Sequence, residues 1–131
     1  MTAIGLLTSC SNIFYDNNGV TPVFTATWPC ENGIADVYPC NGYDLMSYMS
    51  LDDLTPEGIN NVNLAGNDSW GWTDPDTGKE YALVGLNSHT AFVDISNPSM
   101  PILVGVLPTA TLNSIWRDIK VYQNYAFIVS E

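Results

Sequence analysis

Hydrophobic and polar residues alternate with a short period along the second half of the chain, which is typical of β-strands. We expect four strands there, over residues 69–73, 80–86, 90–95 and 102–107. The third strand has the clearest alternation. It puts Ala91, Val93 and Ile95 on one face and Thr90, Phe92 and Asp94 on the other. The pattern therefore predicts a sheet with two distinct faces.

Turn-forming residues separate these strands. Asp74-Pro-Asp-Thr-Gly78 has Pro and Gly where tight turns need them, and Asn87-Ser-His89 is a second short turn. Two prolines within residues 98–101 exclude a central strand, and Pro108 ends the fourth strand. Four short strands joined in this way form an antiparallel meander of β-propeller blade type. The predicted fold class is therefore all-β.

The blade pattern repeats once. Trp70 precedes the segment Tyr81–Val84, and Trp116, 46 residues later, precedes a similar segment that begins at Tyr125, 44 residues after Tyr81. A period in the mid-forties matches blade repeats of about 40–50 residues, although two unrelated hairpins sharing Tyr-Ala are the alternative. One blade cannot bury both faces alone. We therefore expect an incomplete propeller: either a fragment of a longer protein, or copies that complete one another's sheets.

The first half of the chain has a less regular pattern. We divide the sequence into a signal-like start and tether (1–29), an irregular N-terminal segment (30–66), and a first blade with the start of a second (67–131). Leu45 and Met49 have helical spacing, and Ser50 is placed to cap a short turn over Leu51–Leu54. A strand followed by a turn is the alternative for this stretch.

The stretch Leu7-Thr-Ser-Cys10 resembles a bacterial lipobox, in which the cysteine becomes lipidated after export. Cys10 is therefore a candidate lipid-attachment residue. No Lys or Arg precedes it, and the apolar run Ala3–Leu7 is shorter than a signal peptide needs. Either the true start lies upstream or the match is due to chance.

Nine residues separate Cys30 from Cys40, in a loop rich in Gly, Pro and Asn. Their spacing does not fit a Cys-x-x-Cys redox or zinc motif. A disulfide is expected in an oxidising compartment, where closing this loop would stabilise the fold by about 2–3 kcal/mol. Two free thiols in a cytosolic protein are the alternative.

The charge balance excludes several classes of partner. The chain has 14 acidic and 3 basic residues, a formal net charge of −11, and no basic residue before Lys79. Such a surface repels nucleic acids and anionic membranes, so we expect membrane contact only through a lipid anchor. Hydrophobic residues make up 46% of the sequence, which is enough to build a core. No apolar run approaches the ~20 residues of a membrane-spanning helix.

The sequence contains no recognisable catalytic site or cofactor motif. Its one histidine, His89, lies in a predicted turn where we expect it to be exposed, and no Gly-x-Ser-x-Gly motif is present. Asp74 and Asp76 begin like a calcium loop, but the twelfth position is Gly85 instead of Glu. A glycosidase pair could be drawn from several acids, none of which the sequence brings together: Asp52, Asp53, Asp68, Asp74 and Asp94.

Three tryptophans are weak candidates for ligand stacking: Trp70, Trp72 and Trp116. Together they could form a platform for sugar rings. Packing between blades is the interpretation that we favour for them, because large aromatic side chains are mostly buried.

Several stretches resemble the choice-of-anchor B family, bacterial extracellular proteins with LVIVD-type repeats. The resemblance is carried by Asn67-Asp-Ser-Trp-Gly-Trp-Thr-Asp-Pro-Asp-Thr-Gly-Lys-Glu-Tyr-Ala-Leu-Val-Gly85, Thr90-Ala-Phe-Val-Asp-Ile-Ser-Asn-Pro98, Trp116-Arg-Asp-Ile-Lys-Val-Tyr122 and Tyr125-Ala-Phe-Ile-Val-Ser-Glu131. Cys30-Glu-Asn-Gly33, Tyr38-Pro-Cys40 and Asp44-Leu45 also resemble the N-terminal part of that family. The resemblance implies a β-propeller, export, and attachment at the cell surface. It supplies no catalytic residues.

We therefore expect a secreted or surface-anchored binding or scaffold module that holds a glycan, peptide or protein ligand. One alternative is the N-terminal part of an extracellular hydrolase or lyase whose active site lies in further blades. Another is a structural protein that forms homo-oligomers through its open strand edges. Fold alone does not choose between these functions.

Overall fold

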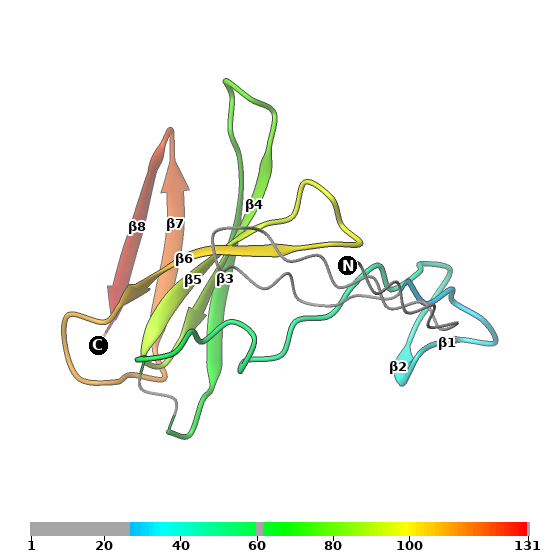
Figure 1. Ribbon diagram of the computed structural model, residues 1–131, viewed down its shortest axis with the longest axis horizontal. Helices are drawn as coiled ribbons and strands as arrows, with labels where there is room; N and C mark the ends of the chain where they lie inside the picture. Colours follow the sequence, from blue (N-terminus) through cyan, green and yellow to red (C-terminus); the bar gives the residue numbers. More distant parts are fainter. Residues whose placement is uncertain (1–26, 60–61, 131) are drawn as a thin grey trace, which may run out of the picture.

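The computed structural model describes residues 27–59 and 62–130, which form only β-structure, turns and irregular segments (Figure 1). Cys10 and the lipobox-like motif lie outside these residues. No helix in the described part of the chain is long and apolar enough to cross a membrane. The strands are β1 (Ile34–Ala35), β2 (Tyr38–Pro39), β3 (Gly66–Thr73), β4 (Glu80–Leu86), β5 (His89–Asp94), β6 (Ile102–Pro108), β7 (Arg117–Tyr122) and β8 (Tyr125–Ser130).

The predicted meander is confirmed as an antiparallel four-stranded sheet in the order β3-β4-β5-β6. Its register pairs Trp72 with Tyr81 and Leu83 with Phe92. β3 begins three residues earlier than expected, at Gly66, where a bulge separates its first pair from the rest. β6 runs on to Pro108, which is tolerated because β6 is an edge strand and needs no outward ladder bond there.

A separate hairpin, β7-β8, repeats the first two strands of the sheet. Tyr81 is near the start of β4 and pairs with Trp72, and Tyr125 is at the start of β8 and pairs with Tyr122. The two tyrosines therefore occupy equivalent positions. The expected equivalence of Trp70 and Trp116 is wrong. Trp70 lies inside β3 opposite Leu83, whereas Trp116 precedes β7, and the register places Lys120 at the position that matches Trp70.

One face of the four-stranded sheet packs against the N-terminal segment. The core of this contact is Leu54, Leu86, Ala91 and Val93, each at most 5% exposed. Met49, Leu51 and Leu64 add apolar surface from the N-terminal side. Ala91 and Val93 are on one of the two faces that the alternation predicted, and burying them there is what attaches residues 49–59 and 62–64 to the blade.

His89 strengthens the same contact, and the prediction of an exposed turn histidine is wrong. The side chain is 0% exposed at the start of β5. Its Nε2 donates to the carbonyl oxygen of Leu54 at 2.9 Å, and its Nδ1 pairs with the Ser88 hydroxyl at 2.9 Å. The turn residues before β5 are buried because the N-terminal segment covers them, a long-range contact that the local turn pattern does not reveal.

The turn predicted after Ser50 is present, but no helix precedes it. The Asp53 carboxylate accepts hydrogen bonds from the Ser50 amide and hydroxyl, and the Ser50 hydroxyl accepts one from the Asp53 amide. This reciprocal pairing satisfies donors at the start of the turn, as a capping box does. Leu54 is thereby placed against the sheet.

The opposite face of the sheet packs against the β7-β8 hairpin (Figure 1). Ile119 of β7 is 0% exposed there. Its amide donates to the Asp68 carboxylate of β3 at 2.7 Å, and Arg117 Nε donates to the Leu86 carbonyl at 3.1 Å. The blade is therefore covered on both faces, by the N-terminal segment on one and by the second hairpin on the other.

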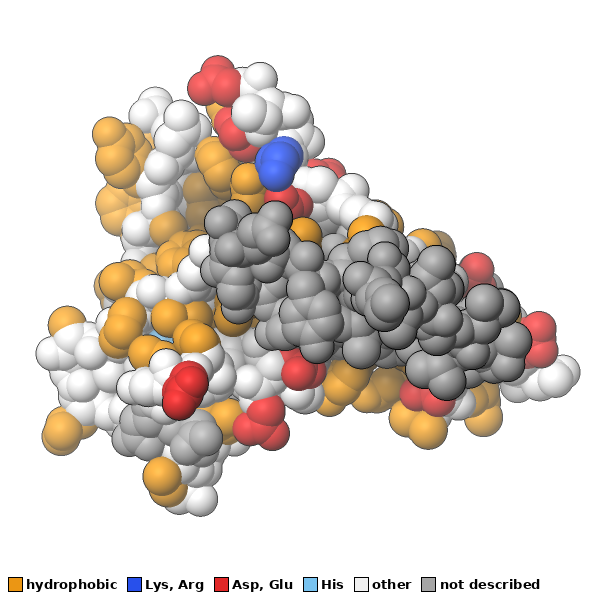
Figure 2. All heavy atoms as spheres, in the orientation of Figure 1, with side chains coloured by type: hydrophobic (Ala, Val, Ile, Leu, Met, Phe, Trp, Pro, Cys, Tyr) orange, Lys and Arg blue, Asp and Glu red, His pale blue; other side chains and the backbone are white. Residues whose placement is uncertain are grey.

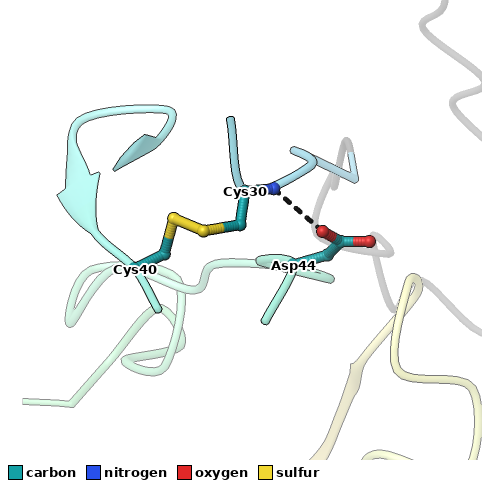
Figure 3. The surroundings of a disulfide bond; sticks show 3 residues. All are labelled: Cys30, Cys40 and Asp44. Atoms are coloured by element: carbon teal, nitrogen blue, oxygen red, sulfur yellow. Dashed lines mark hydrogen bonds between the residues drawn. A yellow bond between two sulfur atoms is a disulfide. The ribbon is translucent and has the colours of Figure 1, made fainter. Parts of the chain in front are cut away.

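The expected disulfide joins Cys30 to Cys40 across the small β1-β2 hairpin, with the two Cα atoms 5.9 Å apart (Figure 3). The amide of Cys30 also donates to the Asp44 carboxylate at 2.8 Å. Backbone bonds between Trp28 and Leu45 close this loop further. The region lies at the end of the molecule far from β7 and β8 (Figure 1).

Candidate functional site

The sheet and the second hairpin enclose two adjacent hollows between them. The larger, here the apolar hollow, has a volume of about 380 Å³ and the smaller, here the rim hollow, about 340 Å³. The apolar hollow is lined by Trp72, Tyr81, Leu83, Phe92, Val104, Gly105, Val121, Asn124, Tyr125 and Ala126. The rim hollow is lined by Trp70, Gly71, Trp72, Thr73, Pro75, Val121, Gln123 and Asn124.

Trp72 lines both hollows and is held on two sides. Its ring stacks on Tyr81 with the ring centres 5.5 Å apart and the planes at 28°. Its indole N–H donates to the backbone carbonyl of Gln123 at 3.1 Å. Because the indole donor is used inside the protein, Trp72 offers a ligand mainly the surface of a fixed aromatic ring.

Trp70 is held by a cation. Lys120 Nζ lies 4.8 Å from the centre of its ring, and the same ammonium group lies 3.7 Å from the Asp68 carboxylate. The hydrogen bond from the Ile119 amide is the main reason that the pKa of Asp68 lies below its ordinary value. Asp68 therefore stays ionised and pairs with Lys120, so this pair contributes little net charge beside the rim hollow.

The tight turn between β7 and β8 supplies the polar side of the rim hollow. Gln123 has a φ of 54°, in the left-handed region that a side chain seldom adopts. The side-chain amides of Gln123 and Asn124 form no hydrogen bond with any residue of 27–59 or 62–130. Sequence reasoning missed both residues. The sequence did contain a signal for them, because Gln123 and Asn124 are the two residues that connect the strands following Trp116 in the repeat.

Neither hollow is lined by a charged side chain among the described residues. This contrasts with the net charge of −11 on the whole chain. The arrangement suits an uncharged ligand, because a charged one would lose its hydration without gaining a partner.

The structure brings together two of the three predicted tryptophans. Trp70 and Trp72 share the rim hollow, whereas Trp116 lines neither hollow. The side chain of Trp116 is 67% exposed and that of Trp70 is 39% exposed, so Trp116 does not pack between the sheet and the second hairpin and Trp70 packs there only in part.

Four of the five acidic residues considered for catalysis have side chains engaged in structural contacts: Asp53, Asp68, Asp74 and Asp94. Asp94 binds Lys79 Nζ at 2.9 Å, Asp53 caps its turn, and Asp74 accepts bonds from Thr77 and the Asp76 amide. The Asp74 contacts confirm that Asp74-Pro-Asp-Thr-Gly78 is turn chemistry. Within residues 27–59 and 62–130, no three His, Cys, Asp or Glu side chains cluster in a way that could hold a metal ion.

Comparisons with known proteins match the part of this site that follows β3. Residues 79–109 and 116–131 match the LVIVD repeat family. The first segment spans β4 to β6 and the second spans β7 and β8. No curated protein and no solved structure matches the chain. LVIVD repeats are propeller-blade repeats, so the hollows lie between a propeller-type blade and the first hairpin of a second LVIVD repeat.

Proposed function

We propose that this protein is a secreted or surface-anchored β-propeller module, related to the bacterial choice-of-anchor B proteins, that binds a ligand and catalyses no reaction itself. The observation that carries the proposal is the uncharged, aromatic cleft between the sheet and the second hairpin. Clefts of this size, with apolar walls and a few polar groups, are where small ligands usually bind.

Two further observations support the proposal. The Cys30–Cys40 disulfide is of the kind that forms and persists in oxidising compartments, which supports export. His89, the one histidine of the sequence, is fully buried with both ring nitrogens engaged. It is therefore not available as a general base, which argues against a hydrolysis that depends on histidine.

Export and binding are tested separately. Cells producing the protein from its natural gene are treated with an external protease, and loss of the protein from intact cells supports surface display. Protection until the cells are broken contradicts it.

For binding, tryptophan fluorescence of the purified chain is followed while oligosaccharides, peptides or exported proteins are added separately. A saturable change with one class, lost in Trp72→Phe and kept in Trp116→Phe, supports the proposal. No change with any class overturns it, and so does chemical conversion of the ligand detected by mass spectrometry.

A second candidate function is self-association through β8. Tyr125, Phe127 and Val129 of this strand are each more than half exposed, and Figure 2 shows hydrophobic side chains gathered over the part of the molecule where β7 and β8 lie. Among the described strands, β8 pairs only with β7. Its free edge carries no charge or proline that would hinder pairing with another strand.

A further inference from the structure

We propose that the rim hollow is a subsite for one uncharged sugar ring of a glycan. This inference rests on the proposed function and names its ligand class. The hollow has a volume of about 340 Å³, close to the lower end of the range for small-ligand sites. Trp70 and Trp72 form one wall, and the turn residues Gln123 and Asn124 form the facing part.

The side chains of the hollow match the two surfaces of a sugar. The C–H face of a pyranose ring packs on aromatic rings, and the fixed ring of Trp72 provides such a surface without further ordering. Sugar hydroxyls both donate and accept hydrogen bonds. An amide side chain has donors and an acceptor as well, so Gln123 and Asn124 can serve hydroxyls in either role.

The charges around the hollow select a neutral sugar. No lining residue is charged, and the nearby Lys120 is paired with Asp68 and Asp118. A sulfated, phosphorylated or uronic-acid ring would find no free cation there, and the net charge of −11 would repel it. A basic ring would find no free carboxylate in the lining.

The backbone at Gln123 gives an independent reason to assign a role to this turn. A residue with a side chain at φ 54° costs on the order of 1–3 kcal/mol, and Gly or Asn is usual in such a position. The backbone carbonyl of Gln123 accepts the hydrogen bond that fixes Trp72, and a residue of any type at position 123 would supply this carbonyl. The long amide side chain is exposed and has no hydrogen-bond partner within the described part of the protein, which leaves it available to a ligand.

The rim hollow is also the better site of the two. It lies beside the end of β3 and the β7-β8 turn, because Thr73, Pro75 and Gln123 line it. The apolar hollow includes Val104, Gly105 and Ala126, so a strand added along the free edge of β8 would cover it. None of the residues that line the rim hollow lies in β8.

The test uses calorimetric titration of the full chain with neutral oligosaccharides of glucose, mannose, xylose and N-acetylglucosamine. Polygalacturonate and a neutral peptide mixture serve as competing ligand classes. We expect at least one neutral oligosaccharide to bind, with affinity reduced at least fivefold in Asn124→Ala and in Gln123→Gly. Gln123→Gly relieves the backbone strain, so its Tm should equal or exceed that of the wild type, which separates lost binding from lost folding.

Two control variants locate the site. Trp116→Ala and Leu112→Ala, both outside the two hollows, should keep the wild-type affinity. Equal losses in either control, or unchanged affinity in both turn variants, would show that the sugar binds elsewhere and overturn the inference. Binding of peptide alone would overturn the sugar assignment while leaving the proposed function standing. If no ligand class binds, both proposals are wrong.

Discussion

At the scale of single residues, the close contact of blade and hairpin depends on the missing side chain of Gly85. A Cβ atom there would lie 2.3 Å from Asn67 Oδ1 and 3.2 Å from both Asp68 O and Ile119 Cδ1. Asn67 is held by its bond to the Asp68 amide, and Ile119 is fully buried. Neither neighbour can move away without opening the interface.

We therefore expect Gly85→Ala to lower the free energy of unfolding by about 1–3 kcal/mol, the usual cost of overpacking. Urea denaturation followed by circular dichroism measures the change. Gly71→Ala is the matched control, because a Cβ atom at Gly71 has no neighbour within 4 Å. The control should stay within about 0.5 kcal/mol of the wild type. Equal losses in both variants would contradict the role given to Gly85.

Asp94 should make stability depend on acid pH. Hydrogen bonds from the Ser96 hydroxyl and from Lys79 lower the pKa of Asp94 from 3.8 to about 2. A carboxylate whose pKa is lower in the folded state stabilises the protein fully above the unfolded value, and loses that contribution as the pH falls toward the folded value. The loss should therefore occur between about pH 4 and pH 2.

Urea midpoints measured from pH 2 to pH 6 test this expectation. Asp94→Asn should lower the midpoint at pH 6 and flatten its fall below pH 4. Lys79→Gln removes the second cause only and should have a smaller effect, because the Ser96 hydroxyl remains. An unchanged acid slope in Asp94→Asn would refute the assignment.

At the scale of elements, the disulfide is expected to stabilise its own loop more than the blade. Cys30 and Cys40 lie in the β1-β2 region, whereas the N-terminal side of the core that joins this segment to the sheet is built by Met49, Leu51, Leu54 and Leu64. Replacing both cysteines by serine removes a loop constraint of about 2–3 kcal/mol. Amide hydrogen exchange should then speed up over residues 28–45 and stay slow in β4 and β5. Equally faster exchange in β4 would show that loop and blade unfold together.

The sequence predicted the elements better than it predicted their contacts. Alternation located β4 exactly at its observed bounds and β5 and β6 to within one residue, because a strand's pattern is local. The Ser50 turn and the Asp74 turn were also predicted from local hydrogen-bonding chemistry. His89 was not, because its burial depends on Leu54, which is 35 residues away.

The candidate site was predicted only in part, because it too depends on contacts between residues far apart in the sequence. Trp72 was a candidate from the sequence, but its fixed position depends on Gln123, which is 51 residues away. No local pattern indicates that the β7-β8 turn lies against the end of β3. The sequence repeat predicted that Trp70 and Trp116 are equivalent, and only the strand register shows that they occupy different positions.

At the scale of the whole molecule, the exposed edge of β8 should make the chain associate as its concentration rises. Light scattering coupled to size exclusion measures the mass. We expect Val129→Lys to reduce the association, because a lysine on an edge strand hinders pairing with another strand. Leu112→Lys, at a position that is 88% exposed and outside β8, is the control and should associate like the wild type. A wild-type mass that stays monomeric at every concentration contradicts this prediction.

The packing of residues 49–59 and 62–64 on the first blade makes the two sides of the stack of sheets different. A sheet, from this chain or from another, can be added beyond β7-β8 without displacing anything, but on the opposite side it meets the N-terminal segment and not the blade itself. In a closed ring of blades, the last sheet would therefore join the first through this segment, with His89 and Leu54 directly beneath the seam. The strength of such a closure would be set by an irregular stretch of chain, in contrast to the sheet-to-sheet contacts elsewhere in the ring.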